Sequence, residues 1–487
     1  LAALHATEEE NRGAHDGSFG GIASAARACE TESSDARPSA KTETVFRDAP
    51  YLSAGVSTPD RSARSGTDGT NDRRIGGGRR TEEVLQRCEK RCEPTLVENG
   101  IARYEFDLSF ENPMTWSPES PKSYRLRFSL STGDTVEVVT GRRTLDIRDA
   151  RFLLNGTPRF LCGISKHEDH PDLGATNPPE LVRTDLDTIQ SMNADYVRTA
   201  HYPHSRTELA AARERGLLVA EEIPFYQAGN GFIHWYSDKR PIREFPVTVF
   251  GLRHLRDKAL LSNARRQLIE MVERDRNNPA VVIWGIANES YTLGRRSVEV
   301  YRWMRDIVRL FDDTRPVTLA EFTYGKRILD RLRRGGDAVD ILSVNAYYGW
   351  YYGRLSDLPV TLDRLHRRYP EKPIIVSEFG AGAVAGRRDS DGVYRAPRVP
   401  PNRTFSEEYQ SSLIDRYIQE ARSRSYVAGV SPWVYADFFC TEFPTNPIPF
   451  TNLKGVVTSR RTPKRSYDQL RRRYEQIRAM ETGRADG

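Results

Sequence analysis

The stretch AVVIWGIANE at residues 280–289 decides the fold of this chain. Its apolar run is short, contains β-branched side chains and is typical of a strand buried on both faces of a parallel sheet. Seven other runs of this kind alternate with amphipathic segments of helical periodicity. The eight runs lie at residues 160–165, 194–200, 217–223, 280–289, 316–321, 341–348, 373–379 and 427–438. This alternation predicts an α/β fold, a (β/α)8 TIM barrel over residues 150–475.

A doubly wound sheet is the alternative that alternating strands and helices leave open. No glycine-rich phosphate loop follows any of the predicted strands, which counts against that alternative. The predicted barrel is longer than the typical ~250 residues. We therefore expect long connections after two of its strands, at residues 224–262 and 380–408.

The chain before the barrel differs in composition from the rest. Residues 96–149 alternate apolar and polar positions in short segments such as SYRLRFSLST at 123–132, which predicts a small or partial antiparallel β-sandwich. Residues 1–95 contain three aromatic side chains and no tryptophan. This low-complexity composition predicts a mostly disordered segment with a short helix at 81–92. Residues 476–487 are predicted to form a C-terminal tail.

Composition excludes several classes of protein. With 38% hydrophobic residues in 487, the chain can bury a sizeable core. The net charge of +6 is spread along the chain, so we expect no nucleic-acid partner. No run of about 18 apolar residues is present, so we expect no membrane span. The five cysteines form no paired zinc pattern, and neither a metal nor a cofactor is expected.

The sequence says little about compartment or assembly. Its first residues, LAALHATEEENR, do not resemble a signal peptide, which slightly favours the cytoplasm. Association into a homo-oligomer is left open.

Two carboxylates end buried strands at the predicted barrel mouth, where TIM-barrel side chains do their chemistry. Glu289 closes the run at 280–289, and Glu378 is the last polar residue of the run at 373–379. A carboxylate that closes a buried strand is costly unless it is paired or used. Since strands four and seven lie on opposing arcs, the two side chains should face each other, as the cleavage of a glycosidic bond requires. An ordinary salt bridge at the rim is the alternative for each.

Several stretches resemble the catalytic barrel of glycoside hydrolase family 2, which contains β-galactosidases, β-mannosidases and β-glucuronidases. They are RDRNNPAVVIWGIANES (274–290), PIIVSEFG (373–380), FLCGISKHEDHPDLG (160–174), NADYVRTAHYP (193–203) and GLLVAEEIP (216–224). The resemblance covers residues 150–475 and implies the same TIM barrel. The segment at 112–158 looks like part of the immunoglobulin-like domain that precedes the barrel in this family.

The resemblance implies a retaining β-glycosidase with two carboxylates. Glu289 is then the general acid/base and Glu378 the nucleophile. Arg198 is placed beside Glu378 to hold it ionised, and Tyr347 to donate a hydrogen bond to it. Asn288 is placed to bind the 2-hydroxyl of the sugar. An apolar strand would keep Glu289 protonated by desolvation.

Three segments resemble the β-glucuronidases of this family in particular: VNAYYGWYYG (344–353), WVYADF (433–438) and NLKG (452–455). In that group an Asn-x-Lys motif binds the substrate carboxylate, which implies this role for Asn452 and Lys454. A uronic acid carries an anion at C6 where a neutral hexose carries a hydroxymethyl group. An ammonium and an amide donor would form charge-assisted hydrogen bonds with that anion.

Four further residues, Asp169, His201, Tyr351 and Trp433, are expected to complete the sugar pocket. Trp433 would be its apolar floor. The chain departs from the β-glucuronidase pattern in two places: Val434 stands where an asparagine is usual, and the segment before the Asn-x-Lys motif lacks an arginine often found there. A β-galacturonidase or β-galactosidase is therefore the alternative for the sugar.

Two other classes of function stay open. A metal-dependent hydrolase is considered because His167, His170, His201 and His204 follow the first two predicted strands, although their spacings fit no zinc motif. A catalytically weak carbohydrate-binding homologue is considered because residues 1–95 do not look like the jelly-roll domain that normally begins this family. The expected partner is a carbohydrate substrate, a β-linked uronide.

Overall fold

The computed structural model describes most of the barrel region and several strands before it. The described residues are 113–130, 133–228, 254–323, 333–389 and 405–482, together with the strands at 51–57, 84–91, 96–98, 101–103, 236–237 and 240–241.

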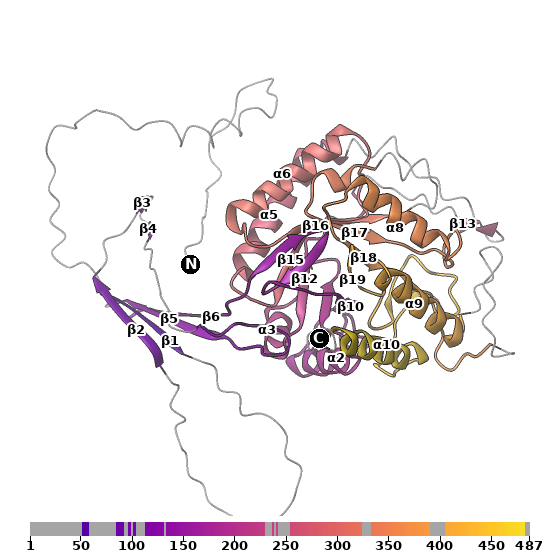
Figure 1. The fold of residues 1–487 in the computed structure, drawn as a ribbon, viewed down its shortest axis with the longest axis horizontal. Helices are drawn as coiled ribbons and strands as arrows, with labels where there is room; N and C mark the ends of the chain where they lie inside the picture. Colours follow the sequence, from indigo (N-terminus) through magenta and orange to yellow (C-terminus); the bar gives the residue numbers. More distant parts are fainter. Residues whose placement is uncertain are drawn as a thin grey trace, which may run out of the picture. The chain divides into compact units, whose positions relative to one another are not determined.

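Eight parallel strands form a closed barrel, and each pairs with the next along the chain until the last pairs with the first. Every strand predicted for the barrel is present, so the TIM-barrel prediction is confirmed (Figure 1). The strands consist almost wholly of buried residues, which explains why their sequences are continuous apolar runs. They are β10 (Leu161–Lys166), β11 (Tyr196–Thr199), β12 (Leu218–Glu222), β15 (Val281–Asn288), β16 (Val317–Phe322), β17 (Ile341–Asn345), β18 (Ile374–Glu378) and β19 (Val427–Val430).

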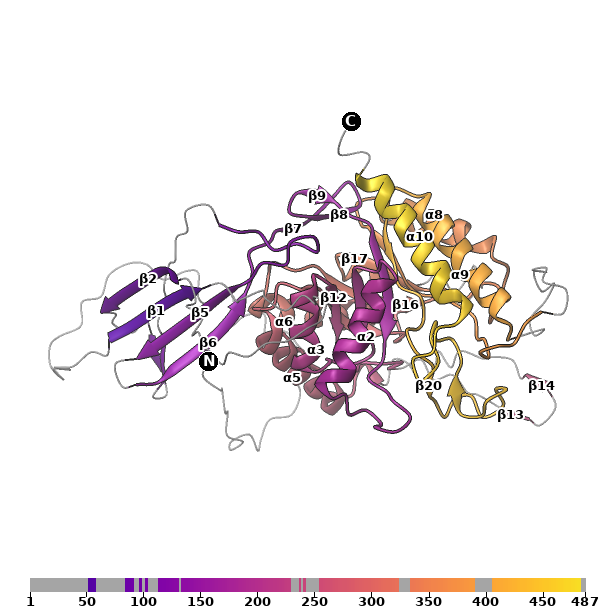
Figure 2. The ribbon, with the colours of Figure 1, turned by 90° about the horizontal axis from the view of Figure 1, so that it is seen from below.

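Helices surround the strands of the barrel (Figures 1 and 2). Local signals set their ends: the Ser205 hydroxyl caps α3 by accepting from the Glu208 amide, and Gly216 ends the same helix in the left-handed conformation. Asp257 and Ser406 cap α5 and α9 in the same way. The helices are α2 (Pro179–Ser191), α3 (Arg206–Arg215), α5 (Lys258–Asp275), α6 (Arg295–Phe311), α8 (Asp357–Arg368), α9 (Glu407–Arg422) and α10 (Arg465–Thr482), with a 3₁₀ turn η1 at Gly335–Asp337.

Short antiparallel pairs connect or precede these units. The strands β7 (Leu145–Arg148), β8 (Arg151–Leu154) and β9 (Thr157–Pro158) form a small sheet that leads into β10. Two more hairpins, β13 (Tyr236–Ser237) with β14 (Arg240–Pro241) and β20 (Phe438–Phe439) with β21 (Thr451–Asn452), follow barrel strands. The first of these lies in the long connection predicted at 224–262.

A four-stranded sheet has the strand order β2-β1-β5-β6. Two of its strands, β5 (Tyr124–Leu130) and β6 (Thr135–Thr140), were predicted from their alternation. The other two, β1 (Tyr51–Ser57) and β2 (Val84–Arg91), lie before the predicted boundary at residue 96. The strands β3 (Leu96–Glu98) and β4 (Ile101–Arg103) form a hairpin of their own.

The strands β1 and β2 correct two expectations about residues 1–95. The helix predicted at 81–92 is wrong, because residues 84–91 form the strand β2. The prediction of a mostly disordered segment is wrong for β1 and β2, and its remaining part lies outside the described residues. The physical reason is that VLQRCEKR is rich in good helix formers, while pairing with neighbouring strands overrides that local preference.

Within the ranges that the structure describes, no helix combines the length and the apolar character that a membrane crossing requires.

One buried ion pair fixes the N-terminal ends of β15 and β16. The Arg315 guanidinium contacts the Asp312 carboxylate at 2.5 Å and donates to three backbone carbonyls, including that of Val281 at 2.7 Å. The indole of Trp284 donates to the same carboxylate at 2.8 Å. Arg315 and Asp312 are 6% and 7% exposed, so neither charge could be solvated if its partner were lost.

We therefore expect Arg315→Leu to lower the free energy of unfolding by about 3–5 kcal/mol, because it leaves Asp312 buried without its cation. Arg148→Ala is the control, since it breaks an ion pair with Asp146 in which both side chains are largely exposed; its cost should stay below about 1 kcal/mol. Urea unfolding of both variants measures the difference. Equal losses of unfolding free energy in the two variants would contradict the stabilising role of the Arg315–Asp312 pair.

Candidate active site

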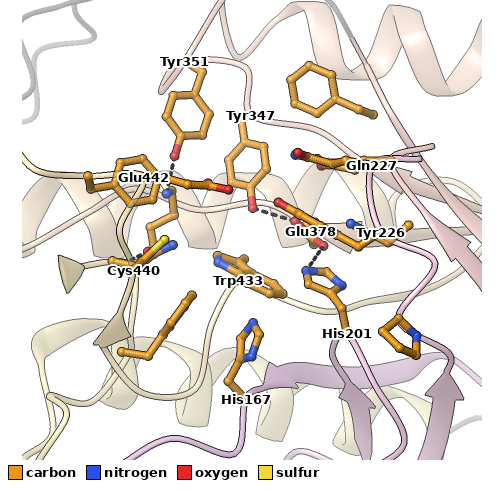
Figure 3. A pocket seen from close by; sticks show the side chains of 18 of the residues that line it. His167, His201, Tyr226, Gln227, Tyr347, Tyr351, Glu378, Trp433, Cys440 and Glu442 are labelled. Carbon is orange, nitrogen blue, oxygen red and sulfur yellow. Dashed lines mark hydrogen bonds and ion pairs between the residues drawn. The ribbon is translucent and has the colours of Figure 1, made fainter. Parts of the chain in front are cut away.

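A cavity of about 420 Å³ opens where the C-terminal ends of the barrel strands meet (Figure 3). Both predicted catalytic residues, Glu289 and Glu378, line it. All other residues predicted for the site line it too, with two exceptions, Asp169 and Arg198. The strands bring these side chains together because parallel strands in a barrel end at one rim.

Glu378, the last residue of β18, is held by donors on both of its oxygens. Arg198 donates to Oε1 at 2.6 Å. The Tyr347 hydroxyl donates to Oε2 at 2.9 Å (Figure 3). The His201 ring lies 3.8 Å from Oε1. The Glu378 carboxylate is 4% exposed. The cation and the phenol orient this carboxylate, and a carboxylate can act as a nucleophile.

Arg198 lies behind the cavity wall and connects several of its residues. It forms two hydrogen bonds with the Glu222 carboxylate, at 2.9 and 3.1 Å, and one with the side-chain oxygen of Asn288 at 2.8 Å. Burial opposes its charge, but the carboxylates of Glu222 and Glu378 outweigh burial and raise the pKa of Arg198. The guanidinium therefore stays charged and orients both acidic side chains.

Glu289 has a different environment. It accepts hydrogen bonds from the neutral amides of Asn345 at 2.9 Å and Gln227 at 3.2 Å. Burial, together with the nearby charge of Glu378, raises the pKa of Glu289 to about 7. Its φ of 49° lies in the left-handed region, which is unusual for a residue other than glycine and is often found at functional sites. Glu289 can therefore hold a proton near neutral pH, whereas Glu378 is bonded to a cation.

Two asparagines connect the carboxylates. The Asn345 amide nitrogen donates to Asn288 as well as to Glu289, and the Ser377 hydroxyl donates to the Asn345 oxygen at 2.8 Å. The side-chain oxygen of Asn288 is thus occupied, while its Nδ2 atom is buried and has no hydrogen-bond partner among the described residues. Because Asn288 lines the cavity, this nitrogen is available as a donor to a bound molecule.

The cavity has an aromatic wall. The Trp433 and His201 rings stack at 4.9 Å with 16° between their planes, and the His167 ring meets Trp433 edge-on at 5.1 Å. Burial lowers the pKa of His167 well below its usual value, and the nearby histidines and Arg198 act in the same direction. A neutral imidazole and an indole face suit the apolar faces of a sugar ring.

At another side of the cavity Lys454 presents an ammonium group. It donates to the Tyr351 hydroxyl, and its Nζ lies 4.7 Å from the centre of the Tyr351 ring and 4.8 Å from that of Phe443. The side-chain oxygen of Asn452 accepts from the Lys454 amide at 3.2 Å. This places a cation with two predicted partners at one end of the cavity, on the turn that follows β21.

One predicted site residue lies elsewhere. Asp169 does not line the cavity: its Oδ2 accepts from the Phe439 amide at 3.2 Å, and its carbonyl accepts from Arg461 at 3.0 Å. Asp169 thus contacts the β20 hairpin, whose Phe438 lines the cavity, and its place in the sugar pocket stays a prediction. Asp169 lies three residues beyond the end of β10, so its direction depends on the loop and not on the strand, and here it binds the β20 hairpin.

Sequence reasoning gave no role to three side chains that matter in this geometry. Asn345 ends β17 as Glu378 ends β18, so its position at a buried strand end was a usable signal. Glu222, at the end of β12, offered the same signal. Gln227 offered none, because it lies in the loop after β12 and reaches Glu289 only through the tertiary fold.

Among the described residues one group, Glu168, His204 and Glu208, has side chains close enough to hold a metal ion. An internal cation already occupies this place, since the Lys166 ammonium lies 2.9 Å from Glu208, and His204 is bonded to the same carboxylate at 3.0 Å. The metal-hydrolase alternative gains no support from this group. At the cavity His167 contacts aromatic rings, and His201 contacts the Trp433 ring and the Glu378 carboxylate.

The structure resembles solved structures of known enzymes. It matches a β-glucuronidase from Ruminococcus gnavus with a TM-score of 0.69 and 23% identity, over 88% of this chain and 64% of that one. At this identity the likeness establishes the fold.

Sequence comparison extends this likeness. The chain is 32% identical to the β-glucuronidase of Mus musculus over 371 residues, 74% of this chain and 51% of the relative. It is 29% identical to that of Paenibacillus borealis over 381 residues, 76% of this chain and 59% of the relative. The chain thus spans about half the length of the curated relatives it matches. The model for the TIM barrel domain of glycosyl hydrolases family 2 matches residues 145–479. The chain belongs to glycoside hydrolase family 2.

Proposed function

We propose that this protein is a retaining β-glycosidase that hydrolyses β-D-glucuronides. The observation that carries the proposal is the contrast between two carboxyl groups in one cavity: Glu378 is held by a cation, and burial raises the pKa of Glu289 to about 7. One acid and one anion are what the first step of glycoside cleavage needs. The β-glucuronidase relatives support the same chemistry.

In the first step the Glu378 carboxylate attacks the anomeric carbon, and the bond from that carbon to the leaving oxygen breaks. Glu289 gives its proton to the leaving oxygen, so the aglycone departs as a neutral alcohol. A covalent glycosyl ester on Glu378 remains. For such a pair we expect the carboxyl groups to stand about 5–5.5 Å apart.

In the second step Glu289, now ionised, takes a proton from water. The hydroxide oxygen attacks the anomeric carbon, the ester bond to Glu378 breaks, and the sugar leaves with its original configuration. The charge of Glu378 is restored, with Arg198 and Tyr347 bonded to it again. Asn288 would bind the 2-hydroxyl through its Nδ2 atom, and Trp433 would lie under the sugar ring.

The C6 carboxylate of the sugar would bind at Lys454. An ammonium and the Tyr351 hydroxyl bonded to it offer donors that a carboxylate can accept and that a hydroxymethyl group uses less well. Asn452 lines the same part of the cavity. This arrangement favours a uronic acid over a neutral hexose.

Substitution of the two carboxylates should separate their roles. Glu378→Ala is expected to abolish turnover of every aryl β-D-glucuronide, because no glycosyl ester can form. Glu289→Gln should slow a phenyl glucuronide by roughly 10²–10⁴-fold, the range for general acid catalysis, and a dinitrophenyl glucuronide far less, because that leaving group needs little protonation. Steady-state rates on both substrates measure this. A wild type as inert as both variants, while sugar still binds, would favour a non-catalytic carbohydrate-binding protein.

The pH profile should report the proton on Glu289. Since Glu289 must be protonated in the free enzyme and its pKa is raised to about 7, kcat/KM should fall as the pH rises through about 7. Glu289→Gln should remove this alkaline limb. Asn345→Ser deletes a hydrogen bond that favours the ionised form, so it should move the limb to higher pH. An alkaline limb of kcat/KM that is unchanged in both variants would show that Glu289 is not the group that titrates.

Lys454→Ala should weaken the preference for a glucuronide over a glucoside. Removal of a charged hydrogen-bond donor costs about 1.5–3 kcal/mol, so kcat/KM for the glucuronide should drop roughly 10- to 100-fold while that for the glucoside changes little. Lys258→Ala, at an exposed lysine that begins α5, is the control and should leave both values unchanged. Aryl glucuronide, galacturonide, glucoside and galactoside are compared side by side. A wild type that prefers the galactoside would refute the uronide assignment, and one that prefers the galacturonide would correct it.

A further inference from the structure

We propose that the buried ion pair of Asp437 and Lys464 positions Lys454 relative to Glu378, and so determines the selectivity for an acidic sugar. The inference rests on the proposed function. Neither residue lines the cavity, so both are positioning residues that act through the backbone on either side of Lys454.

Lys464 connects the two functional segments directly. Its ammonium donates to the Asp437 carboxylate at 2.7 Å, to the carbonyl of Leu453 at 3.2 Å and to that of Ala383 at 2.8 Å. Leu453 is the residue before Lys454, and Ala383 lies five residues beyond Glu378 on the segment that leaves β18. A lysine has three donors, and here all three are used on three different parts of the chain.

Asp437 holds the other side of Lys454. Its Oδ1 accepts from the Gly455 amide at 2.9 Å, and the carbonyl of Lys454 itself accepts from the Val434 amide at 3.2 Å. A side chain at position 455 has no room, because a Cβ there would lie 2.1 Å from the Asp437 amide nitrogen and 2.4 Å from the Val457 carbonyl oxygen. The backbone before, at and after Lys454 is therefore bonded to other segments.

Gln410 of α9 makes a second connection between the same two segments. Its amide nitrogen donates to the carbonyl of Ala381 at 2.9 Å and to that of Gly455 at 3.1 Å, and the Ser466 hydroxyl donates to its oxygen at 2.8 Å. The amide of Ala383 also donates to the carbonyl of Leu453 at 2.8 Å. The turn with Lys454 and the segment after Glu378 thus form one hydrogen-bonded unit.

The burial of the pair indicates that it positions the backbone and adds little stability. Lys464 is 2% exposed and Asp437 is 6% exposed. Burial lowers the pKa of Lys464 and raises that of Asp437 to about 6, although each charge partly offsets this for the other. A buried pair of this kind is a poor source of stability compared with apolar residues of similar volume. What apolar residues could not provide is the set of directed bonds to Leu453, Gly455 and Ala383.

A glucuronide must reach two protein groups at the same time. Its anomeric carbon must reach Glu378, and its C6 carboxylate must reach Lys454. A displacement of about 1 Å between such points can cost on the order of 10²-fold in rate. A neutral hexose makes no charged contact at C6, so it should be less sensitive to the same displacement.

The test is Lys464→Met, assayed as the ratio of kcat/KM for an aryl glucuronide to that for the matching glucoside. We expect the ratio to fall roughly 10- to 100-fold, mainly through KM for the glucuronide. The matched control is Lys166→Met, which removes an equally buried lysine paired with Glu208 and makes no contact with the Lys454 turn. It should lower thermal stability without changing the ratio.

A second variant, Asp437→Asn, tests the same inference. If Lys464→Met does not fold, Asp437→Asn keeps the volume, removes one charge and should lower the ratio by a smaller factor. An unchanged ratio in Asp437→Asn, or an equal loss on both substrates in Lys464→Met, overturns the inference. Failure of the proposed function would look different, because the wild type itself would then show no preference for the glucuronide.

Discussion

The contact between the Arg198 guanidinium and two buried carboxylates is the interaction on which the rest of the site depends. Arg198 binds Glu378 and Glu222 and also holds the side-chain oxygen of Asn288. Both carboxylates are almost wholly buried, and the charge of the guanidinium offsets the cost of burying them. Glu378 thus has a cation beside it, whereas burial raises the pKa of Glu289 to about 7.

That division of charge is what makes one cavity suitable for acid and nucleophilic chemistry. Glu289 and Glu378 lie at the ends of strands of the same barrel and both are buried, yet their partners differ. Neutral amides from Asn345 and Gln227 bind Glu289, whereas a cation and a phenol bind Glu378. The difference lies in the neighbours and not in the carboxyl groups, which is the usual way in which a protein gives two like residues opposite roles.

The Lys454 end of the cavity is held in place in a different way. Lys454 lies on a turn outside the barrel strands, where no strand pairing fixes its position. Backbone hydrogen bonds to Asp437, Lys464 and Gln410 supply the rigidity instead, and they connect this turn to the segment that follows the nucleophile. In this way a loop residue can be held in register with a strand residue, as a substrate bound at both requires.

The sequence by itself determined the barrel and the two carboxylates. Eight apolar runs can be buried only as a parallel sheet covered by helices, and a carboxylate at the end of such a run, as at Glu289, is visible without coordinates. It did not determine the strand at 84–91, because local composition favoured a helix and only pairing with other strands decides otherwise. Nor did it determine the direction of Asp169, the contact of Gln227 with Glu289, or the bonds of Lys464. Those depend on segments that are distant along the chain and meet only when the barrel closes, so no local pattern in the sequence records them.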